Sequence, residues 1–179
     1  MNSVIRRAAK ADAEACASIY RPYVENTDIT FETVAPSSAD MEERIASALE
    51  THEWLILEDD GEVAGYAYAG TFNPRASYQW ACEASVYMDG ARRSNGGGTR
   101  LYTELLNRLR QKGFRRVMGG VTQPNDASNR LHQKFGFELI GTYTKVGWKN
   151  GAWHDVSWYE LDLCPDDHRD TDPGLPPTN

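Results

Sequence analysis

Residues 92–110 read RRSNGGGTRLYTELLNRLR, and the fold prediction starts from this stretch. Three consecutive glycines, Gly96 to Gly98, come directly before Leu101, Leu105 and Leu109, whose i, i+4, i+8 spacing is typical of an amphipathic helix. The strand-like segment EASVYM, residues 83–88, precedes the glycines. A strand, a glycine loop and a helix N-terminus in this order favour an anion-binding site, because backbone N–H groups and the helix dipole point toward the loop.

Two nucleotide-binding motifs do not fit this loop. A P-loop needs Gly-x-x-x-x-Gly-Lys-Ser/Thr, but Gly98 is followed by Thr99 and Arg100. A dinucleotide-binding fingerprint needs Gly-x-Gly-x-x-Gly, but position 101 is leucine. A flexible turn that binds no ligand stays open as the structural alternative.

The order of predicted elements indicates a mixed α/β (α+β) domain. We expect a strand, two helices, three strands, a helix, a strand, a helix and two strands, which gives a partly antiparallel sheet of about seven strands with flanking helices. Asp60-Gly61 and Asn150-Gly151 predict tight hairpin turns. Pro22 is predicted to bend or restart the first helix.

Length and composition favour one globular domain. The chain has 179 residues, of which 40% are apolar. We expect residues 1–164 to form this domain, and residues 165–179, which are polar and rich in proline, to form a disordered tail. The net charge of −7 argues against a general nucleic-acid binder, because no basic excess is present to neutralise phosphates.

Several classes of site and location are also disfavoured by the sequence. Cys16, Cys82 and Cys164 are odd in number and widely spaced, so they fit neither a disulfide framework nor a zinc site, and no metal is expected. No apolar run approaches the roughly 18 residues that span a membrane. The N-terminus has no apolar core of the signal-peptide kind, so a cytoplasmic location is expected.

Two motifs resemble those of a known family. The spacing Arg93-x-x-Gly96-x-Gly98 resembles the Arg/Gln-x-x-Gly-x-Gly/Ala signature of GNAT-family N-acetyltransferases, in which the loop holds the pyrophosphate of acetyl-CoA. Residues 125–137, NDASNRLHQKFGF, resemble a later motif of the same family, with His132 in place of its common tyrosine. From about residue 2 to residue 164, the chain resembles phosphinothricin N-acetyltransferases and their methionine sulfoximine-acetylating relatives, in which this position is histidine.

The resemblance implies a GNAT fold, acetyl-CoA as co-substrate and a homodimer. It also implies that the pantetheine arm pairs with the backbone of Val86 and Met88 like an added strand, and that an amide near Val86 polarises the thioester carbonyl. Gly97 falls at a variable position of the signature. The implied acetyl-CoA contacts are Val86, Tyr87, Met88, Arg93, Ser94, Asn95, Gly96, Gly97, Gly98, Thr99 and Asn125, with Lys134 either at a phosphate or in solvent.

Two residues are implied to carry the acid–base chemistry. An ammonium must lose a proton before it can attack a thioester, so a general base is needed. Glu83 lies among apolar neighbours, where desolvation raises the pKa of a carboxyl group, and the resemblance places the base at this position. His132 is the implied second acid–base group, because an imidazole can donate or accept a proton near neutral pH.

The implied acceptor is an amino acid with a tetrahedral polar side chain, such as phosphinothricin, methionine sulfoximine or methionine sulfone. Arg75 is the expected clamp for its carboxylate, because guanidinium binds carboxylate through two hydrogen bonds. Trp153, His154 and Asp155 are expected to serve packing or a dimer interface. The remaining candidates for the acceptor pocket are Phe31, Glu32, Thr33, Ala76, Ser77 and Tyr78.

Two alternatives stay open. The chain could acetylate another amine, such as a polyamine, an aminoglycoside or a peptide N-terminus, although Arg75 would repel a cationic substrate. It could also be a non-catalytic acyl-CoA sensor, which would keep the glycine loop and lose the acid–base pair Glu83 and His132. No nucleic-acid or membrane partner is expected.

Overall fold

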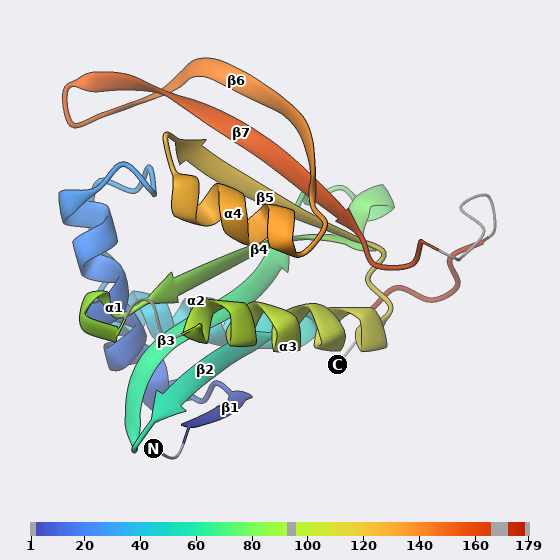
Figure 1. Cartoon of the computed structure of the whole chain (residues 1–179). Coiled ribbons are helices and arrows are strands. Elements are labelled where there is room, and N and C mark those ends of the chain that lie inside the picture. Colours follow the sequence, from blue (N-terminus) through green and yellow to red (C-terminus); the bar gives the residue numbers. More distant parts are fainter. Residues whose placement is uncertain (1–2, 93–95, 166–171, 178–179) are drawn as a thin grey trace.

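A seven-stranded mixed sheet with flanking helices forms the molecule, as predicted (Figure 1). The computed structural model describes residues 3–92, 96–165 and 172–177. The strand order is β1-β2-β3-β4-β5-β7-β6. The strands are β1 Ser3–Arg7, β2 Trp54–Asp59, β3 Glu62–Thr71, β4 Ala81–Met88, β5 Arg116–Gln123, β6 Glu138–Lys149 and β7 Ala152–Asp162. The α-helices are α1 Ala13–Asn26, α2 Ser38–Thr51, α3 Gly97–Lys112 and α4 Asp126–Lys134.

The two predicted hairpin turns both form, and their backbone angles are those of tight turns. Asp60 and Gly61 have φ angles of 52° and 86°, and Asn150 and Gly151 have φ angles of 52° and 79°. Positive φ at both central residues is what a two-residue type I′ turn requires. These turns join β2 to β3 and β6 to β7 in antiparallel pairs.

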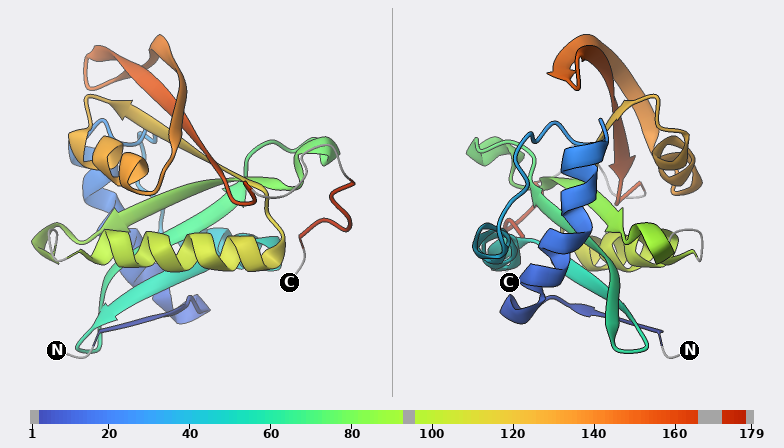
Figure 2. Two further views of the ribbon diagram at one scale, coloured as in Figure 1. Left: turned by 45° about the vertical axis from the view of Figure 1, so that its right-hand side comes forward. Right: turned by 90° about the vertical axis from the view of Figure 1, so that its left-hand side faces the viewer.

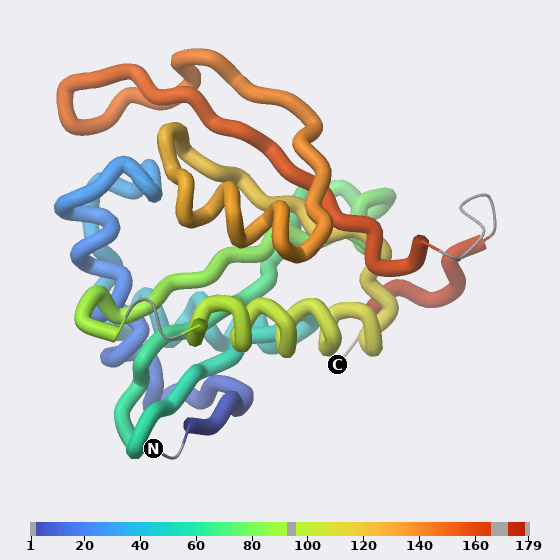
Figure 3. Tube along the Cα trace, in the orientation of Figure 1, coloured from blue at the N-terminus to red at the C-terminus, as the bar shows by residue number. Residues whose placement is uncertain are grey.

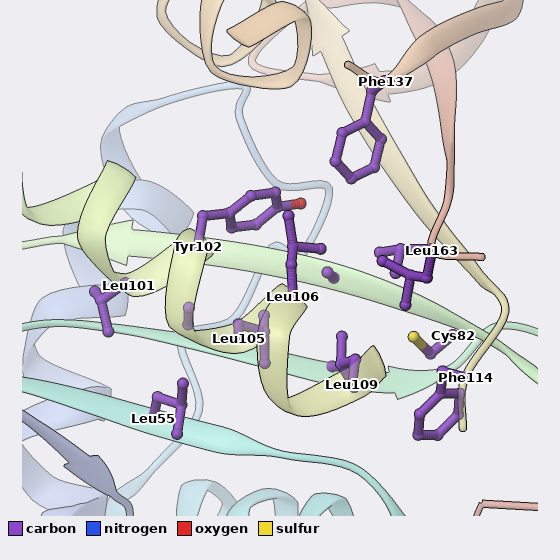
Figure 4. Close-up of a cluster of buried hydrophobic side chains, with 14 of the residues drawn as sticks. Leu55, Cys82, Leu101, Tyr102, Leu105, Leu106, Leu109, Phe114, Phe137 and Leu163 are labelled. Atoms are coloured by element: carbon purple, nitrogen blue, oxygen red, sulfur yellow. The ribbon is translucent and has the colours of Figure 1, made fainter. Parts of the chain in front are cut away.

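The helices cover opposite faces of the sheet, and each face has its own apolar core (Figure 2). Leu101, Leu105 and Leu109 of α3 are fully buried against β2, β3 and β4, so the leucine spacing is confirmed as a core stripe (Figure 4). On the other face, α1 and α2 bury Tyr20 and Met41 over the aromatic side chains of β2 and β3.

Pro22 was predicted to bend or restart the first helix, and the restart is wrong because Pro22 lies inside a continuous α1. The helix is continuous from Ala13 to Asn26. Proline removes one backbone donor from the helix interior. Burial of Ile19, Tyr23 and Val24 on both sides of it stabilises the helical path in spite of that loss.

The C-terminal tail is described only in part. Residues 164–165 and 172–177 form neither helix nor strand. The remainder of the predicted tail lies outside the described residues, so the domain boundary near residue 164 stays a prediction.

One irregularity of the sheet creates the space for a site. β4 and β5 run parallel, but they pair only where Ala81, Cys82 and Glu83 face Arg116, Val117 and Met118. Beyond this point β4 continues beside β3 to Met88, while β5 continues beside β7 to Gln123. The two strands therefore diverge toward their C-terminal ends, and a gap opens in the middle of the sheet (Figure 1).

Candidate active site

Two adjoining cavities occupy the gap between β4 and β5. The inner one, about 60 Å³, is lined by residues 84–87 of β4, residues 120–122 of β5, Tyr102 of α3 and His132 of α4. The outer one, about 480 Å³, reaches Gly96, Gly97, Gly98 and Thr99 at the start of α3. Both cavities share Ile29, Val86, Asn125 and Ser128 in their linings, so they form one channel from the glycine loop to the centre of the sheet.

The backbone of β4 presents hydrogen-bonding groups to this channel. The N–H of Asp89 donates to the Ala64 carbonyl of β3. In an antiparallel ladder alternate residues face the neighbouring strand, so the N–H and C=O of Val86 point away from β3 and into the gap. The expected pairing partner Val86 is therefore well directed for an added strand.

Met88, the other expected backbone partner, is engaged by a residue that the sequence did not single out. The Tyr23 hydroxyl of α1 donates to the Met88 carbonyl at 2.7 Å and accepts from the Met88 N–H at 3.1 Å. Tyr87 points to the same helix and packs edge-on against Tyr20 and Tyr23. These contacts hold the end of β4 to α1.

The glycine loop approaches the channel at its outer end. Gly96 has φ 73°, in the left-handed region that favours glycine. A Cβ at Gly97 would lie 2.7 Å from side-chain atoms of Leu57 and Met88, whereas a Cβ at Gly98 would have ordinary contacts of 3.8–3.9 Å. Arg93, Ser94 and Asn95 lie outside the described residues.

Of two further residues expected to bind acetyl-CoA, Asn125 lines the channel and Lys134 does not. Asn125 lines both cavities, and its side chain caps α4 by accepting from the Ser128 N–H at 3.1 Å. Lys134 is exposed at the end of α4 and lies outside the described lining of both cavities.

His132 is buried in the inner cavity, with 5% of its surface exposed. Its Nδ1 lies 2.8 Å from the Ser128 carbonyl, to which an Nδ1–H donates. That bond leaves Nε2 as an acceptor, and Nε2 has no hydrogen-bond partner among the described residues. Burial lowers the pKa of His132, against the opposing effect of the Ser128 carbonyl, so the neutral imidazole is favoured.

The packing around His132 fixes the plane of its ring. Tyr159 stacks on the imidazole at 5.2 Å between centroids, and Phe137 meets it edge-on at 4.8 Å. The Tyr159 hydroxyl donates to Asn129 Oδ1 at 3.0 Å. At Gly119 a Cβ would lie 2.4 Å from His132 Nε2, so β5 can pass this closely only because residue 119 has no side chain.

Tyr102 is a candidate functional residue that the sequence did not reveal. It is fully buried on α3 among the core side chains (Figure 4). It lines the inner cavity with His132, and its hydroxyl has no partner among the described residues. Burial raises the pKa of Tyr102, so its hydroxyl stays protonated at neutral pH. In the sequence, Tyr102 follows Leu101 and is indistinguishable from a core residue of the leucine stripe.

Glu83 lies on the other side of the sheet from His132. Cys82 and Ala84 pack in the core beneath α3, so alternation directs Glu83 to the face covered by α1 and α2. The side chain is half-buried, and burial raises the pKa of its carboxyl group. Its carboxylate has no ion-pair partner in the part of the chain that the structure describes.

Glu83 and His132 therefore face the gap from opposite sides of the sheet. Glu83 is the last residue of β4 that pairs with β5, so it stands at the point where the gap begins. A molecule in the gap would meet Glu83 from one face of the sheet and His132 with Tyr102 from the other.

Arg75 and its neighbours lie in the connection between β3 and β4, which projects from the sheet (Figure 3). The connection leaves β3 after Thr71, one residue beyond Gly70, the partner of Glu83. Arg75, together with Ala76, Ser77 and Tyr78 of the short helical turn, is exposed. Tyr78 meets Phe72 edge-on at 5.8 Å between ring centroids.

The expected acceptor residues before α2 serve to hold their own loop. Both carboxylate oxygens of Glu32 accept from Arg44, at 2.7 and 2.9 Å, and Tyr20 donates to the same group. The Arg44 guanidinium holds the pKa of the Glu32 carboxyl below its usual value. Phe31 packs on Gly147 of β6, and Thr33 is exposed.

Trp153, His154 and Asp155 make contacts within the β6–β7 hairpin and to the loop after α1, and the choice between packing and a dimer interface stays a prediction. Trp153 meets Trp148 at 5.4 Å between ring centroids, and the Asp155 carboxylate accepts from the Lys145 N–H at 2.7 Å. His154 Nε2 lies 3.0 Å from the Lys149 carbonyl and 3.6 Å from the Asp28 carboxylate. Of these contacts, only the one between His154 and Asp28 joins the β6–β7 hairpin to the loop after α1.

Within residues 3–92, 96–165 and 172–177, no group of three or more His, Cys, Asp or Glu side chains is placed to hold a metal ion. No helix in those ranges is long and apolar enough to cross a membrane.

Comparison with known proteins adds independent findings. Residues 5–158 match the family model of the acetyltransferase (GNAT) domain. The chain is 35% identical over 159 residues to phosphinothricin N-acetyltransferase from Streptomyces viridochromogenes, covering 89% of this chain and 87% of that protein. It is 32% identical to L-methionine sulfoximine/L-methionine sulfone acetyltransferase from Pseudomonas paraeruginosa, covering 92% and 97%.

A solved structure of the same family is also similar to this chain. The crystal structure of a GNAT superfamily phosphinothricin acetyltransferase from Sinorhizobium meliloti in complex with acetyl-CoA superposes with a TM-score of 0.87 and 33% identity. The match covers 91% of this chain and 89% of that one.

Gly119→Ala should disturb the site through His132. Because the added methyl group would overlap Nε2, we expect a loss of about 1–3 kcal/mol in the free energy of unfolding, measured by urea denaturation. Gly120→Ala on the same strand is the control, since its Cβ would approach the Trp158 ring no closer than 3.4 Å. Equal stability of the two variants would contradict the position of the imidazole.

Proposed function

The chain belongs to the GNAT acetyltransferases, and from this premise we propose that it acetylates the α-amino group of a small amino-acid analogue of the phosphinothricin, methionine sulfoximine or methionine sulfone type. The observation that carries the proposal is the half-buried Glu83 carboxylate at the start of the gap. The names of the two relatives supply the substrate class, and acetyl-CoA in the Sinorhizobium structure supplies the donor.

The residues of the channel fit acetyl-CoA, which supplies an activated acetyl group as a thioester. The N-terminus of α3 offers backbone N–H groups and a positive dipole end to a pyrophosphate, and Gly96, Gly97 and Gly98 keep side chains out of the way. Val86 offers its backbone to an extended arm, and its N–H is directed where a thioester carbonyl in the gap would accept a hydrogen bond.

Glu83 is the proposed general base. The raised pKa of its carboxyl group makes the carboxylate a better proton acceptor for an ammonium group, directly or through one water. Because Glu83 lies on the face covered by α1 and α2, we propose that the acceptor amine approaches from that face.

Tyr102 and His132 are proposed to act together at the sulfur on the other face. A neutral His132 whose Nδ1 hydrogen is held by Ser128 accepts at Nε2, so it orients a donor better than it donates. The Tyr102 hydroxyl is such a donor in the same cavity, whose 60 Å³ also has room for water. We assign Tyr102 as the group that protonates the leaving thiolate. Its hydroxyl and His132 Nε2 both lack a partner among the described residues, so a water between them would link the two.

Arg75 is proposed to bind the carboxylate of the acceptor. It is exposed on the connection that leaves β3 beside Glu83, so a shift of this connection would bring its guanidinium toward the amine site. Glu32 is excluded from direct recognition in this arrangement, because Arg44 and Tyr20 already bind its carboxylate.

A cytoplasmic homodimer with a detoxifying role completes the proposal. Acetyl-CoA is a cytoplasmic metabolite, and acetylation would mask the amine of a toxic analogue. Six large apolar side chains of the β6–β7 hairpin are more than half exposed, which a second copy would cover. They are Leu139, Ile140, Tyr143, Val146, Trp148 and Trp153.

A thiol-release assay tests the function. Acetyl-CoA is supplied with methionine sulfoximine, methionine sulfone, phosphinothricin, ordinary amino acids or polyamines, and free CoA thiol is measured. We expect turnover with the three analogues. Turnover with polyamines alone would refute the proposed substrate class, and binding of acetyl-CoA without any turnover would indicate a sensor.

Glu83→Gln should remove the base while keeping the shape of the side chain. We expect kcat to fall by about 10²- to 10⁴-fold, with the dissociation constant of acetyl-CoA unchanged. Because burial raises the pKa of Glu83, the wild-type kcat/KM should decline with falling pH at a value above that of an ordinary glutamate, and the variant should lose this limb. A variant with the wild-type profile would contradict the assignment.

Tyr102→Phe separates catalysis from packing. The hydroxyl has no described partner, so its removal should leave the thermal midpoint unchanged or raise it. If the hydroxyl donates to the leaving sulfur, kcat should fall about 10²-fold. Wild-type kcat in a stable variant would show that Tyr102 only packs.

A further inference from the structure

Glu83 faces a glycine across the strand pair, and the space there is open. Gly70 of β3 is the antiparallel partner of Glu83 in a ladder that runs without irregularity from Thr71 to Gly65. Paired residues project to the same face of a sheet. Because the partner is glycine, no side chain lies next to that of Glu83 on this face. A Cβ built on Gly70 would meet nothing within 4 Å.

The usual reasons for a glycine in a strand do not apply to Gly70. Its backbone is outside the left-handed region, its ladder has no bulge, and no neighbouring atom is close enough to exclude a side chain. Glycine inside a strand weakens it and often marks a place where a ligand comes close. Gly141 of β6 has similar open space, but it lies at a register shift of its ladder, which accounts for it.

A groove leads to Gly70 from α2. It has a volume of about 620 Å³ and runs between α2 and the second half of β3. Gly70 and Thr71 form its end nearest to Glu83. In the described part of the chain, the groove shares no lining residue with the two cavities of the acetyl-CoA channel.

The lining of the groove suits a small polar molecule. Tyr68 supplies a hydroxyl group and rests on Trp54 at 4.4 Å between ring centroids, while the Tyr20 hydroxyl is already bonded to Thr30 and Glu32. Asp40 and Glu43 at the rim favour an approaching ammonium group. The Arg44 guanidinium is bound by Glu32 through two hydrogen bonds, so the groove itself does not provide a carboxylate clamp.

We propose that Gly70 determines which amines reach Glu83. Its missing side chain keeps a passage open between the α2–β3 groove and the carboxylate, and the groove receives the body of a small, polar primary amine. The inference rests on the proposed acetyl transfer with Glu83 as base. Because the groove has no lining residue in common with the acetyl-CoA channel in the described part of the chain, Gly70 would act on the acceptor alone.

A graded series, Gly70→Ala, Gly70→Val and Gly70→Leu, tests this passage. The acceptor is methionine sulfoximine, or whichever amine of the thiol-release panel is turned over. We expect its KM to rise with side-chain size, reaching about 10-fold or more for leucine. The dissociation constant of acetyl-CoA should stay at its wild-type value. The thermal midpoint should not fall, because the added atoms meet open space and a side chain replaces a strand glycine.

Gly141→Leu is the matched control, since it also places a leucine in open space on a strand. A wild-type acceptor KM in Gly70→Leu, or an equal rise in Gly141→Leu, would overturn the inference. A weakened acetyl-CoA affinity in Gly70→Leu would overturn it as well, because Gly70 would not act on the acceptor alone. If only polyamines are turned over, the proposed substrate class is wrong, while the series measured with a polyamine still decides the role of Gly70.

Discussion

The divergence of β4 and β5 after the pair of Glu83 and Met118 is the feature on which the rest of the site depends. Each strand remains fully paired on its other side, β4 with β3 and β5 with β7. The backbone groups that face the gap are therefore the ones left for a ligand, while the sheet itself remains continuous. Two polar contacts stabilise the open arrangement, since Tyr23 binds the end of β4 and Asn125 caps the helix beside the end of β5.

The gap also explains why glycines and large aromatic residues lie side by side around it. Gly119 allows β5 to pass against His132, and Gly98 lets the start of α3 line the channel without a side chain in it. Opposite them, Tyr102 and Tyr159 fill the space around the imidazole. Small residues therefore lie where backbone must come close, and aromatic residues lie where a ring must be held in one plane.

Local patterns in the sequence were sufficient for most of the fold. The leucine spacing of α3, the Asp-Gly and Asn-Gly turns and the order of elements all depend on neighbouring residues, and the structure confirms them. Contacts between distant segments could not be predicted in this way. The Tyr23 hydroxyl reaches Met88 across 65 positions, and nothing near either residue signals the pair. The bond of Glu32 to Arg44 likewise depends on how the loop after α1 folds back on α2.

For the site, the sequence predicted which residues to consider but not how they are arranged, because the arrangement depends on contacts between distant segments. Glu83 and His132 were reached through motif positions, but alternation along one strand does not say which side of the gap each would occupy. Their separation matters for their chemistry. A close pair would lower the pKa of the carboxyl group and raise that of the imidazole through mutual attraction.

With the sheet between them, burial dominates at both residues and favours the neutral form of each, raising the pKa of Glu83 and lowering that of His132. A carboxylate with a raised pKa binds a proton from an amine more readily, and a neutral imidazole whose Nδ1–H is bonded to Ser128 can accept a hydrogen bond at Nε2. Glu83 and His132 therefore lie in different surroundings, on opposite faces of the sheet at one gap.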